Sequence, residues 1–165
     1  MPLVGQALTA TFVIYELYSS YNHQTCIVAS HRNYKTEQFY TKLTNLMCHL
    51  RLSAEQQKVK LTEVKSNEYE IEMIEDNYGM KGWKLYTFPQ DGSVRPVVAH
   101  KYKKSYYSLE KIDDEHYYIK DIESGLYLTP DPANFRDRES VFVMAKKFDD
   151  IKAAGEGIFY LKKIS

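Results

Sequence analysis

The sequence predicts an all-β fold of twelve strands with pseudo-threefold symmetry, and two observations lead to this prediction. Short segments rich in β-branched and aromatic residues alternate with turn residues along nearly the whole chain. Two four-residue patterns also recur three times each, with closely matched spacing. Three repeats of about 50 residues, with four strands each, form a β-trefoil, in which closure of a barrel removes the exposed sheet edges.

The first pattern is a leucine followed three residues later by valine or isoleucine, and it starts at residues 61, 109 and 161, which are 48 and 52 residues apart. The second is Ile-Tyr-Glu-Leu at 14–17, Ile-Glu-Met-Ile at 71–74 and Ile-Lys-Asp-Ile at 119–122. Its starts are 57 and 48 residues apart, so we expect an insertion of about nine residues in the first repeat. The predicted repeats of this single domain are 10–64, 65–112 and 113–165. An open β-sandwich is the main rival, and it predicts no threefold period.

The first repeat opens with a strand at residues 10–18, which are rich in β-branched and aromatic side chains. A polar loop at 19–24, a strand at 25–30 and a loop at 31–35 follow. Residues 36–52 fit two patterns, because their apolar side chains match helical spacing in part and alternate as in a strand from Leu46 to Leu52. We favour a strand at 45–52 and keep a helical turn near 36–43 open.

The remaining strands are separated by turn residues. Gly125 after Ser124 supplies the backbone freedom that a short hairpin turn needs. Loops are expected at 75–82, 130–140 and 148–157. The strands are expected at 58–64, 69–74, 83–88, 95–102, 107–112, 117–122, 126–129, 141–146 and 158–164.

Composition limits the class of protein. The chain has 165 residues, the size of one domain with a proper core, and 22 basic and 22 acidic residues give zero net charge. This balance argues against general affinity for nucleic acid or anionic membranes, and no apolar run is long enough to cross a bilayer. Cys26 and Cys48 could form one disulfide, but two free, buried thiols are favoured. No lysine or arginine precedes Arg32, so we expect a cytoplasmic protein or one exported without a signal peptide.

The residue types needed for catalysis do not gather in the sequence. The five histidines are scattered without metal-ligand spacing, and no Gly-x-Ser-x-Gly element or phosphate-binding loop is present. Both cysteines lie in apolar strands, where thiols are usually inert. We therefore expect a protein without catalytic activity, cofactor or metal.

The segment Tyr-Tyr-Ile-Lys-Asp-Ile, Glu-Ser-Gly and Leu-Tyr-Leu at 117–128 resembles the ricin-B-like and mushroom β-trefoil proteins. Residues 56–61 with 69–71 look like the same repeat junction. Ricin-type lectins usually carry Gln-x-Trp at the repeat ends, where this chain has Val-Lys-Leu (59–61), Tyr-Ser-Leu (107–109) and Phe-Tyr-Leu (159–161). Mycocypins, the mushroom protease inhibitors of this fold, do not need that motif. A weaker resemblance to the interleukin-1 family rests on residues 122–124 and 128–129.

The mushroom resemblance implies a protease inhibitor that acts through surface loops. Three loops are candidates. Asn77, flanked by Tyr78 and Gly79, would face an asparagine-specific cysteine protease. Lys152 in the 148–157 loop would enter a trypsin-like pocket. The 19–24 loop would occupy a papain-like cleft, and its candidate residues are Ser19, Ser20, Tyr21 and Asn22.

The alternative functions are a lectin, an interleukin-1-like signalling ligand, and a cytoskeletal or scaffold trefoil. For sugar binding, Tyr127, Asp131 and Asn134 would combine stacking with hydrogen bonds. The basic group Lys101, Lys103 and Lys104 would suit sulfated glycans. We expect the acidic residues at 113–115 to offset the positive charge of these lysines. The expected partner is a protein, most simply a protease, with glycans as the alternative.

Overall fold

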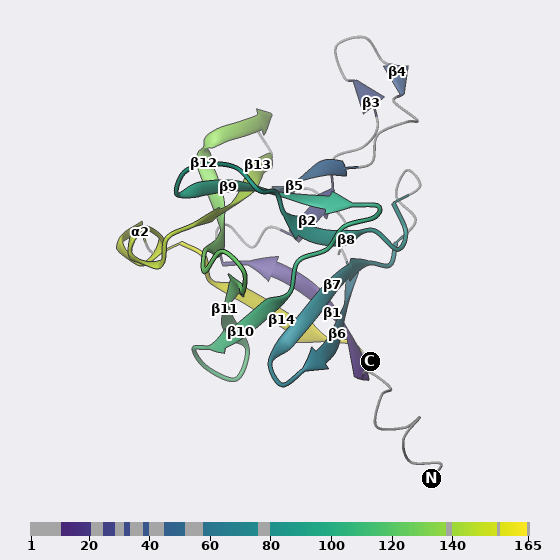
Figure 1. Ribbon diagram of the computed structural model, residues 1–165, viewed down its shortest axis with the longest axis vertical. Coiled ribbons are helices and arrows are strands. Elements are labelled where there is room, and N and C mark those ends of the chain that lie inside the picture. The colour runs from purple at the N-terminus through teal and green to yellow at the C-terminus, as the bar shows by residue number, and fades with distance from the viewer. Residues whose placement is uncertain are drawn as a thin grey trace.

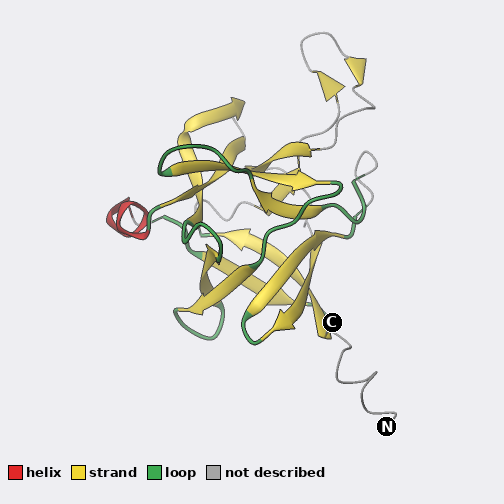
Figure 2. Ribbon diagram, in the orientation of Figure 1, coloured by secondary structure: helices red, strands yellow, loops and turns green. Residues whose placement is uncertain are grey.

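The computed structural model describes residues 11–20, 25–28, 32–33, 38–39, 45–51, 58–75, 80–137, 140–154 and 156–164. Within these ranges the chain forms fourteen strands and one helix, so the predicted all-β class is confirmed, whereas the predicted count of twelve strands is not (Figures 1 and 2). The first seven strands are β1 (Thr11–Ser19), β2 (Thr25–Val28), β3 (Arg32–Asn33), β4 (Gln38–Phe39), β5 (Asn45–Arg51), β6 (Lys58–Lys65) and β7 (Glu68–Met73). The others are β8 (Lys84–Thr87), β9 (Val94–His100), β10 (Tyr107–Lys111), β11 (His116–Asp121), β12 (Tyr127–Asp137), β13 (Ser140–Lys146) and β14 (Phe159–Lys163). The helix is α2 (Phe148–Ala154).

Six strands pair in a closed ring, in the order β1, β6, β7, β10, β11, β14 and back to β1. Three hairpins extend from it, namely β2 with β5, β8 with β9, and β12 with β13. Their second strands, β5, β9 and β13, also pair with one another. In Figure 1 the ring strands occupy the lower half of the molecule and the hairpin strands the upper half. Each pairing type therefore occurs three times.

The strand register shows which residues are equivalent between the repeats. Leu161 lies opposite Leu17, Leu61 opposite Ile71, and Leu109 opposite Ile119. The leucine pattern at 61, 109 and 161 was therefore correctly aligned. The second pattern was misaligned in the first repeat, because Leu17 rather than Ile14 matches Ile71 and Ile119. The corrected spacings are 54 and 48 residues, which reduces the insertion in the first repeat from about nine residues to six (54 − 48).

The core fills the ring in layers that follow this equivalence. One layer contains the three leucines and their partners, Leu17, Ile71 and Ile119, most of them buried. A second layer contains Val59, Tyr107 and Phe159, all at most 1% exposed. Tyr15, Tyr69 and Tyr117 occupy equivalent register positions and pack, partly buried, against the core. Burial of this apolar set is the main stabilising contribution to the fold.

Two expectations about local structure were wrong. The predicted loop at 130–140 is mostly strand, because β12 continues to Asp137. This strand pairs with β13 along one side and with β11 only at Tyr127, so its prolines remove no hydrogen bond from a second neighbour. The loop at 148–157 contains helix α2, which has Asp149 and Asp150 in its first turn, where the helix dipole favours acidic residues.

The helical turn kept open near 36–43 is not observed at Gln38–Phe39, which forms strand β4 and pairs with β3, and the rest of that range lies outside the described residues. The favoured strand at 45–52 is confirmed as β5. The side chain of Cys48 is buried, whereas that of Cys26 lies outside the described part of the chain. In the residues that the structure describes, no helix has the length and apolar character to cross a membrane.

Candidate functional site

A hollow of about 420 Å³ lies where the end of β1 and the starts of β14 and β11 meet. The strand register brings these three ends together, because Tyr160 lies opposite Tyr18 on one side and opposite His116 on the other. The residues that line the hollow are Tyr18, Ser19, Ser20, His116, Tyr160 and Lys162. We call it the β1/β11/β14 hollow.

Aromatic rings form one wall of this hollow. The ring of Tyr160 has its centroid 6.0 Å from that of Tyr18 and 5.7 Å from the imidazole of His116, with tilted planes in both pairs. The hydroxyl of Tyr18 donates a hydrogen bond of 2.8 Å to the buried carboxylate of Glu16. These contacts fix the ring positions, so the wall is formed before any ligand arrives.

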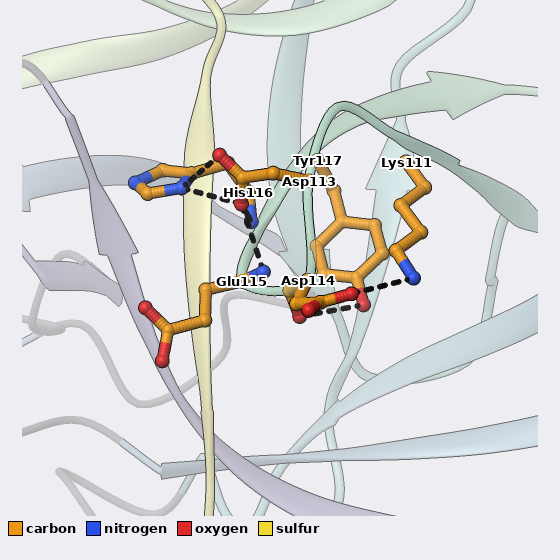
Figure 3. A network of polar contacts seen from close by, with 6 residues as sticks. All are labelled: Lys111, Asp113, Asp114, Glu115, His116 and Tyr117. Atoms are coloured by element: carbon orange, nitrogen blue, oxygen red, sulfur yellow. Dashed lines mark hydrogen bonds and ion pairs between the residues drawn. The ribbon is translucent and has the colours of Figure 1, made fainter.

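The turn between β10 and β11 orients His116 (Figure 3). The backbone amides of Glu115 and His116 each donate to Asp113 Oδ1 at 2.9 Å. His116 Nδ1 lies 2.8 Å and 2.9 Å from the two carboxylate oxygens of the same aspartate. Figure 3 also shows Lys111, whose ammonium lies 3.0 Å from Asp114 Oδ1. Because Asp113 occupies Nδ1, the other ring nitrogen, Nε2, is the one left to contact a ligand.

The hydrogen bonds and the ion pair of this turn also shift the pKa values of Asp113 and Lys111. The hydrogen bonds from Glu115 and His116 lower the pKa of Asp113, so the carboxylate stays ionised. The carboxylate of Asp114 raises the pKa of Lys111. Among the described residues, the hollow therefore combines two phenol rings, an oriented imidazole, two serines and one ammonium group.

Asp113 orients the imidazole of His116 in this hollow. An aspartate that orients a histidine also occurs in general-base sites. However, the described contacts of His116 are to Asp113 and Tyr160, and none places a nucleophile on Nε2. Among the described residues, no group of histidine, cysteine and acidic side chains could hold a metal ion.

The structure brings only part of the predicted inhibitor site into this hollow. Ser19 and Ser20 line it, and Ser19 is the last residue of β1 rather than a loop residue. Tyr21 and Asn22 lie outside the described residues, as do Asn77, Tyr78 and Gly79. Lys152 lies on α2, with its ammonium 6.0 Å from the ring centroid of Phe148, so the extended loop that it was assigned to is absent.

The predicted sugar-binding residues lie in β12 and not in a loop. Tyr127 is 8% exposed, and its hydroxyl donates a 2.6 Å hydrogen bond to Glu110. Asp131 is 5% exposed and pairs with Lys146 at 3.3 Å. Their burial leaves little surface for a sugar, and of the third residue, Asn134, only the backbone is described.

The basic group at 101–104 lines a second hollow, of about 180 Å³, which we call the lysine hollow. The acidic turn at 113–115 does not balance these lysines, because it bonds Lys111 and His116 instead. Their acidic neighbour is Glu70, whose carboxylate contacts Lys104 at 2.6 Å and Lys84 at 2.9 Å. The residues that line this hollow are Gly82, Lys84, His100, Lys101, Tyr102, Lys103 and Lys104.

His100 holds the turn of the lysine hollow and should make it sensitive to acid. Its Nδ1 accepts hydrogen bonds of 2.9 Å from the backbone amides of Tyr102 and Lys103, which requires an unprotonated Nδ1. Burial lowers the pKa of His100 and the ammonium of Lys103 lowers it further. Below the ordinary value of 6.5, the unfolded state therefore binds more protons than the folded one. The contribution of neutral His100 to stability is complete above that pH and is lost as the pH falls through the folded pKa.

We expect the free energy of unfolding to decrease from pH 7 to pH 5 in the native chain and less steeply in His100→Asn. The asparagine oxygen can accept the same amide hydrogen bonds without titrating. His100→Ala leaves both amides without their acceptor and should lower stability at pH 7 by about 2 kcal/mol. Urea unfolding at several pH values measures both effects, and parallel pH profiles for the native chain and His100→Asn would contradict this role.

Sequence reasoning missed most of the β1/β11/β14 hollow. His116 was counted only among scattered histidines, and Tyr18, Tyr160 and Lys162 were counted as strand residues. A usable signal existed, because Asp113 precedes His116 by three residues in a hairpin turn and aspartate is a frequent acceptor in such turns. The register between β11 and β14 was the missing information.

Comparison with known proteins informs the fold. No family model matches the sequence, and no curated protein matches it. A designed threefold-symmetric protein, ThreeFoil, is similar in structure, with a TM-score of 0.67, 13% identity, and coverage of 92% of this chain and 99% of that one. A salivary protein of Culex quinquefasciatus from the Cysteine and Tryptophan-Rich family has a TM-score of 0.68 at 10% identity and covers 95% and 97%.

A third similar structure is 1,3Gal43A, an exo-β-1,3-galactanase from Clostridium thermocellum, with a TM-score of 0.62 and 13% identity. The match covers 92% of this chain and 30% of the enzyme. At such low identity these similarities concern the fold and not the activity. Together with the threefold strand pairing, they show that the chain has a trefoil-like β fold.

Proposed function

We propose that this chain is a non-enzymatic β-trefoil binding protein that takes a neutral saccharide in the β1/β11/β14 hollow. The observation that carries the proposal is the composition of that hollow, in which aromatic rings and oriented polar groups face one volume of about 420 Å³. Small-molecule sites in proteins typically enclose about 300–1,000 Å³ and combine apolar walls with a few placed polar groups.

The two tyrosines supply the apolar contact. The pyranose ring of a sugar has faces of C–H groups that pack against aromatic rings, and the rings of Tyr18 and Tyr160 adjoin one another at 6.0 Å. Both rings have fixed neighbours, namely Glu16 for the first and His116 for the second. Little conformational entropy is then lost when a ligand binds.

The polar groups supply orientation. The ammonium of Lys162 can donate hydrogen bonds to sugar hydroxyls, the hydroxyl of Ser20 can donate or accept them, and His116 Nε2 can accept one when the Nδ1 proton faces Asp113. One ammonium among hydroxyl groups favours a neutral saccharide over a highly charged one. A mixed aromatic and polar lining of this kind discriminates ligands by hydroxyl positions, because an unpaired buried polar group is unfavourable.

Binding to a panel of neutral saccharides tests the proposal, with galactose, lactose, mannose, N-acetylglucosamine and cellobiose measured by calorimetry. We expect at least one to bind, and Tyr160→Ala to weaken it about tenfold, the equivalent of losing an aromatic contact of about 1.4 kcal/mol. Tyr160→Phe should retain most of the affinity. His116→Gln should weaken binding as well, since Asp113 loses its imidazole partner.

Phe12→Ala is the matched control, because Phe12 is an exposed aromatic residue on β1 that does not line the hollow. It should leave saccharide affinity unchanged. Equal weakening by Phe12→Ala and Tyr160→Ala, or no binding by any member of the panel, would count against the proposal.

Protease inhibition is the second candidate, and one observation favours it. The 19–24 loop is held at both ends, since Tyr18 pairs with Thr25 and the Ser20 amide donates to the Ile158 carbonyl at 2.9 Å. A loop held in this way loses little entropy in a protease cleft. Stoichiometric loss of papain-like protease activity, in the absence of saccharide binding, would favour this candidate over the first.

A further inference from the structure

We propose that the lysine hollow is a separate binding site for the sulfate group of a sulfated saccharide. Most of its lining residues lie on the segment that joins β9 to β10, in the turn that His100 fixes. Among the described residues, it shares no lining residue with the β1/β11/β14 hollow. This proposal can therefore be tested independently of neutral saccharide binding.

The turn that carries the lysines is fixed at both ends. At its start, His100 is buried and accepts the amide hydrogen bonds of Tyr102 and Lys103. At its end, Ser105 is buried, donates its amide to the Leu85 carbonyl at 3.0 Å and accepts the Thr87 amide on its hydroxyl at 2.9 Å. The lysines therefore project from a rigid backbone, which limits the entropy lost when an anion binds.

The charges that face this hollow are unbalanced. Four lysines line it, Lys84, Lys101, Lys103 and Lys104, and Glu70 is the one carboxylate paired with any of them among the described residues. Counting the four ammonium groups against Glu70 leaves a local charge of +3 (4 − 1) on a chain whose net charge is zero. Within the described part of the chain, Lys101 and Lys103 have no acidic partner. A local positive potential of this kind attracts anions.

The kind of anion follows from the lining residues. Lysine ammonium groups bind phosphate-like oxyanions as point charges, and several of them can contact different oxygens of one sulfate or phosphate. Tyr102 is 73% exposed, and the ammonium of Lys101 lies 5.5 Å from its ring centroid. An exposed aromatic face beside free ammonium groups fits a sugar ring that carries the anionic group.

The geometry favours a short sulfated saccharide over a nucleic acid. The cluster occupies one turn and a hollow of about 180 Å³, with no basic track leading away in its lining. Nucleic-acid sites usually follow the phosphate backbone over several positive side chains in a row. A sulfated saccharide and free inorganic sulfate or phosphate would both present an oxyanion to the lysines. Only the saccharide would also contact the aromatic face of Tyr102.

The test measures binding of a heparin-derived hexasaccharide to the full chain, at low and physiological salt. We expect the double substitution Lys101→Gln with Lys103→Gln to weaken affinity about tenfold and to reduce its dependence on salt. Tyr102→Ala should weaken the saccharide but not inorganic sulfate. A matched double substitution, Lys65→Gln with Lys147→Gln, removes two exposed lysines elsewhere and should change affinity less than twofold.

Three outcomes would overturn the proposal. The first is equal weakening by the two double substitutions, which would show a non-specific charge effect. The second is equal affinity for the fully desulfated hexasaccharide, which would show that sulfate is not recognised. The third is binding of inorganic sulfate or phosphate without detectable binding of the hexasaccharide, which would leave a free oxyanion site only. Tyr160→Ala should leave hexasaccharide affinity unchanged and serves to separate the two hollows.

Discussion

Ile119→Ala is expected to lower the free energy of unfolding by about 2–5 kcal/mol, the range for deleting a large aliphatic side chain in a packed core. Ile119 is 1% exposed and lies opposite Leu109 in the layer shared by all three repeats. Because neighbouring strands of a closed ring cannot move independently, the cavity would not collapse easily. Urea denaturation measures the loss.

Ile122→Ala is the matched control, since Ile122 follows three residues later in the same repeat motif and is 37% exposed. Ile122→Ala should lower the free energy of unfolding by less than about 1 kcal/mol. The register correction gives the same test in the first repeat, where Leu17→Ala should be far more harmful than Ile14→Ala. Similar losses for Leu17→Ala and Ile14→Ala would contradict the threefold register.

Gly157→Ala is expected to lower stability by about 2–4 kcal/mol, through backbone strain and overpacking together. Gly157 has φ of +79°, which residues with a Cβ rarely adopt. An added Cβ would also lie 2.8 Å from Ile151 Cδ1 and 3.2 Å from the Leu128 carbonyl oxygen. Ile151 is 1% exposed, so its side chain has little room to move away.

Gly125→Ala separates the two causes. Gly125 has φ of +73°, yet an added Cβ would have nothing within 4 Å. It should therefore show the backbone strain alone, about 1–2 kcal/mol. Thermal unfolding compares the stabilities of the two variants directly. If Gly157→Ala loses no more stability than Gly125→Ala, α2 does not pack on Gly157.

The fold could be predicted largely because each repeat places leucine at the same inward position. Leu61, Leu109 and Leu161 had to be apolar to fill the ring, so their spacing appears in the sequence. Ile14 was misread because four-residue patterns cannot tell the two faces of a strand apart. Only the pairing partner decides this, and Leu17 has Leu161 as its partner.

The local errors have a similar origin. The prolines of β12 were taken as a loop signal, yet an edge position tolerates them. Helix α2 has seven residues, a length at which helical periodicity is barely detectable. Its buried Ile151 is explained by packing near Gly157, a contact that depends on tertiary structure.

The candidate site was predicted only in part, because it consists of contacts between distant segments. Ser19 and Ser20 were identified as loop residues, whereas His116 and Tyr160 join them only through the pairing of β14 with both β1 and β11. The lysine group was visible in the sequence, but its acidic partner was misassigned. Proximity in sequence suggested the 113–115 turn, while the neighbouring strand supplies Glu70.

The most direct test of the proposed function is a map of backbone amide chemical shifts during titration with whichever neutral saccharide of the panel binds. We expect the largest saturable shifts at the residues of the β1/β11/β14 hollow, centred on His116 and Tyr160. The same titration of Tyr160→Ala should show weaker, non-saturating shifts. Saturable shifts confined to another surface, with His116 and Tyr160 unchanged, would contradict the assignment of this hollow as the saccharide site.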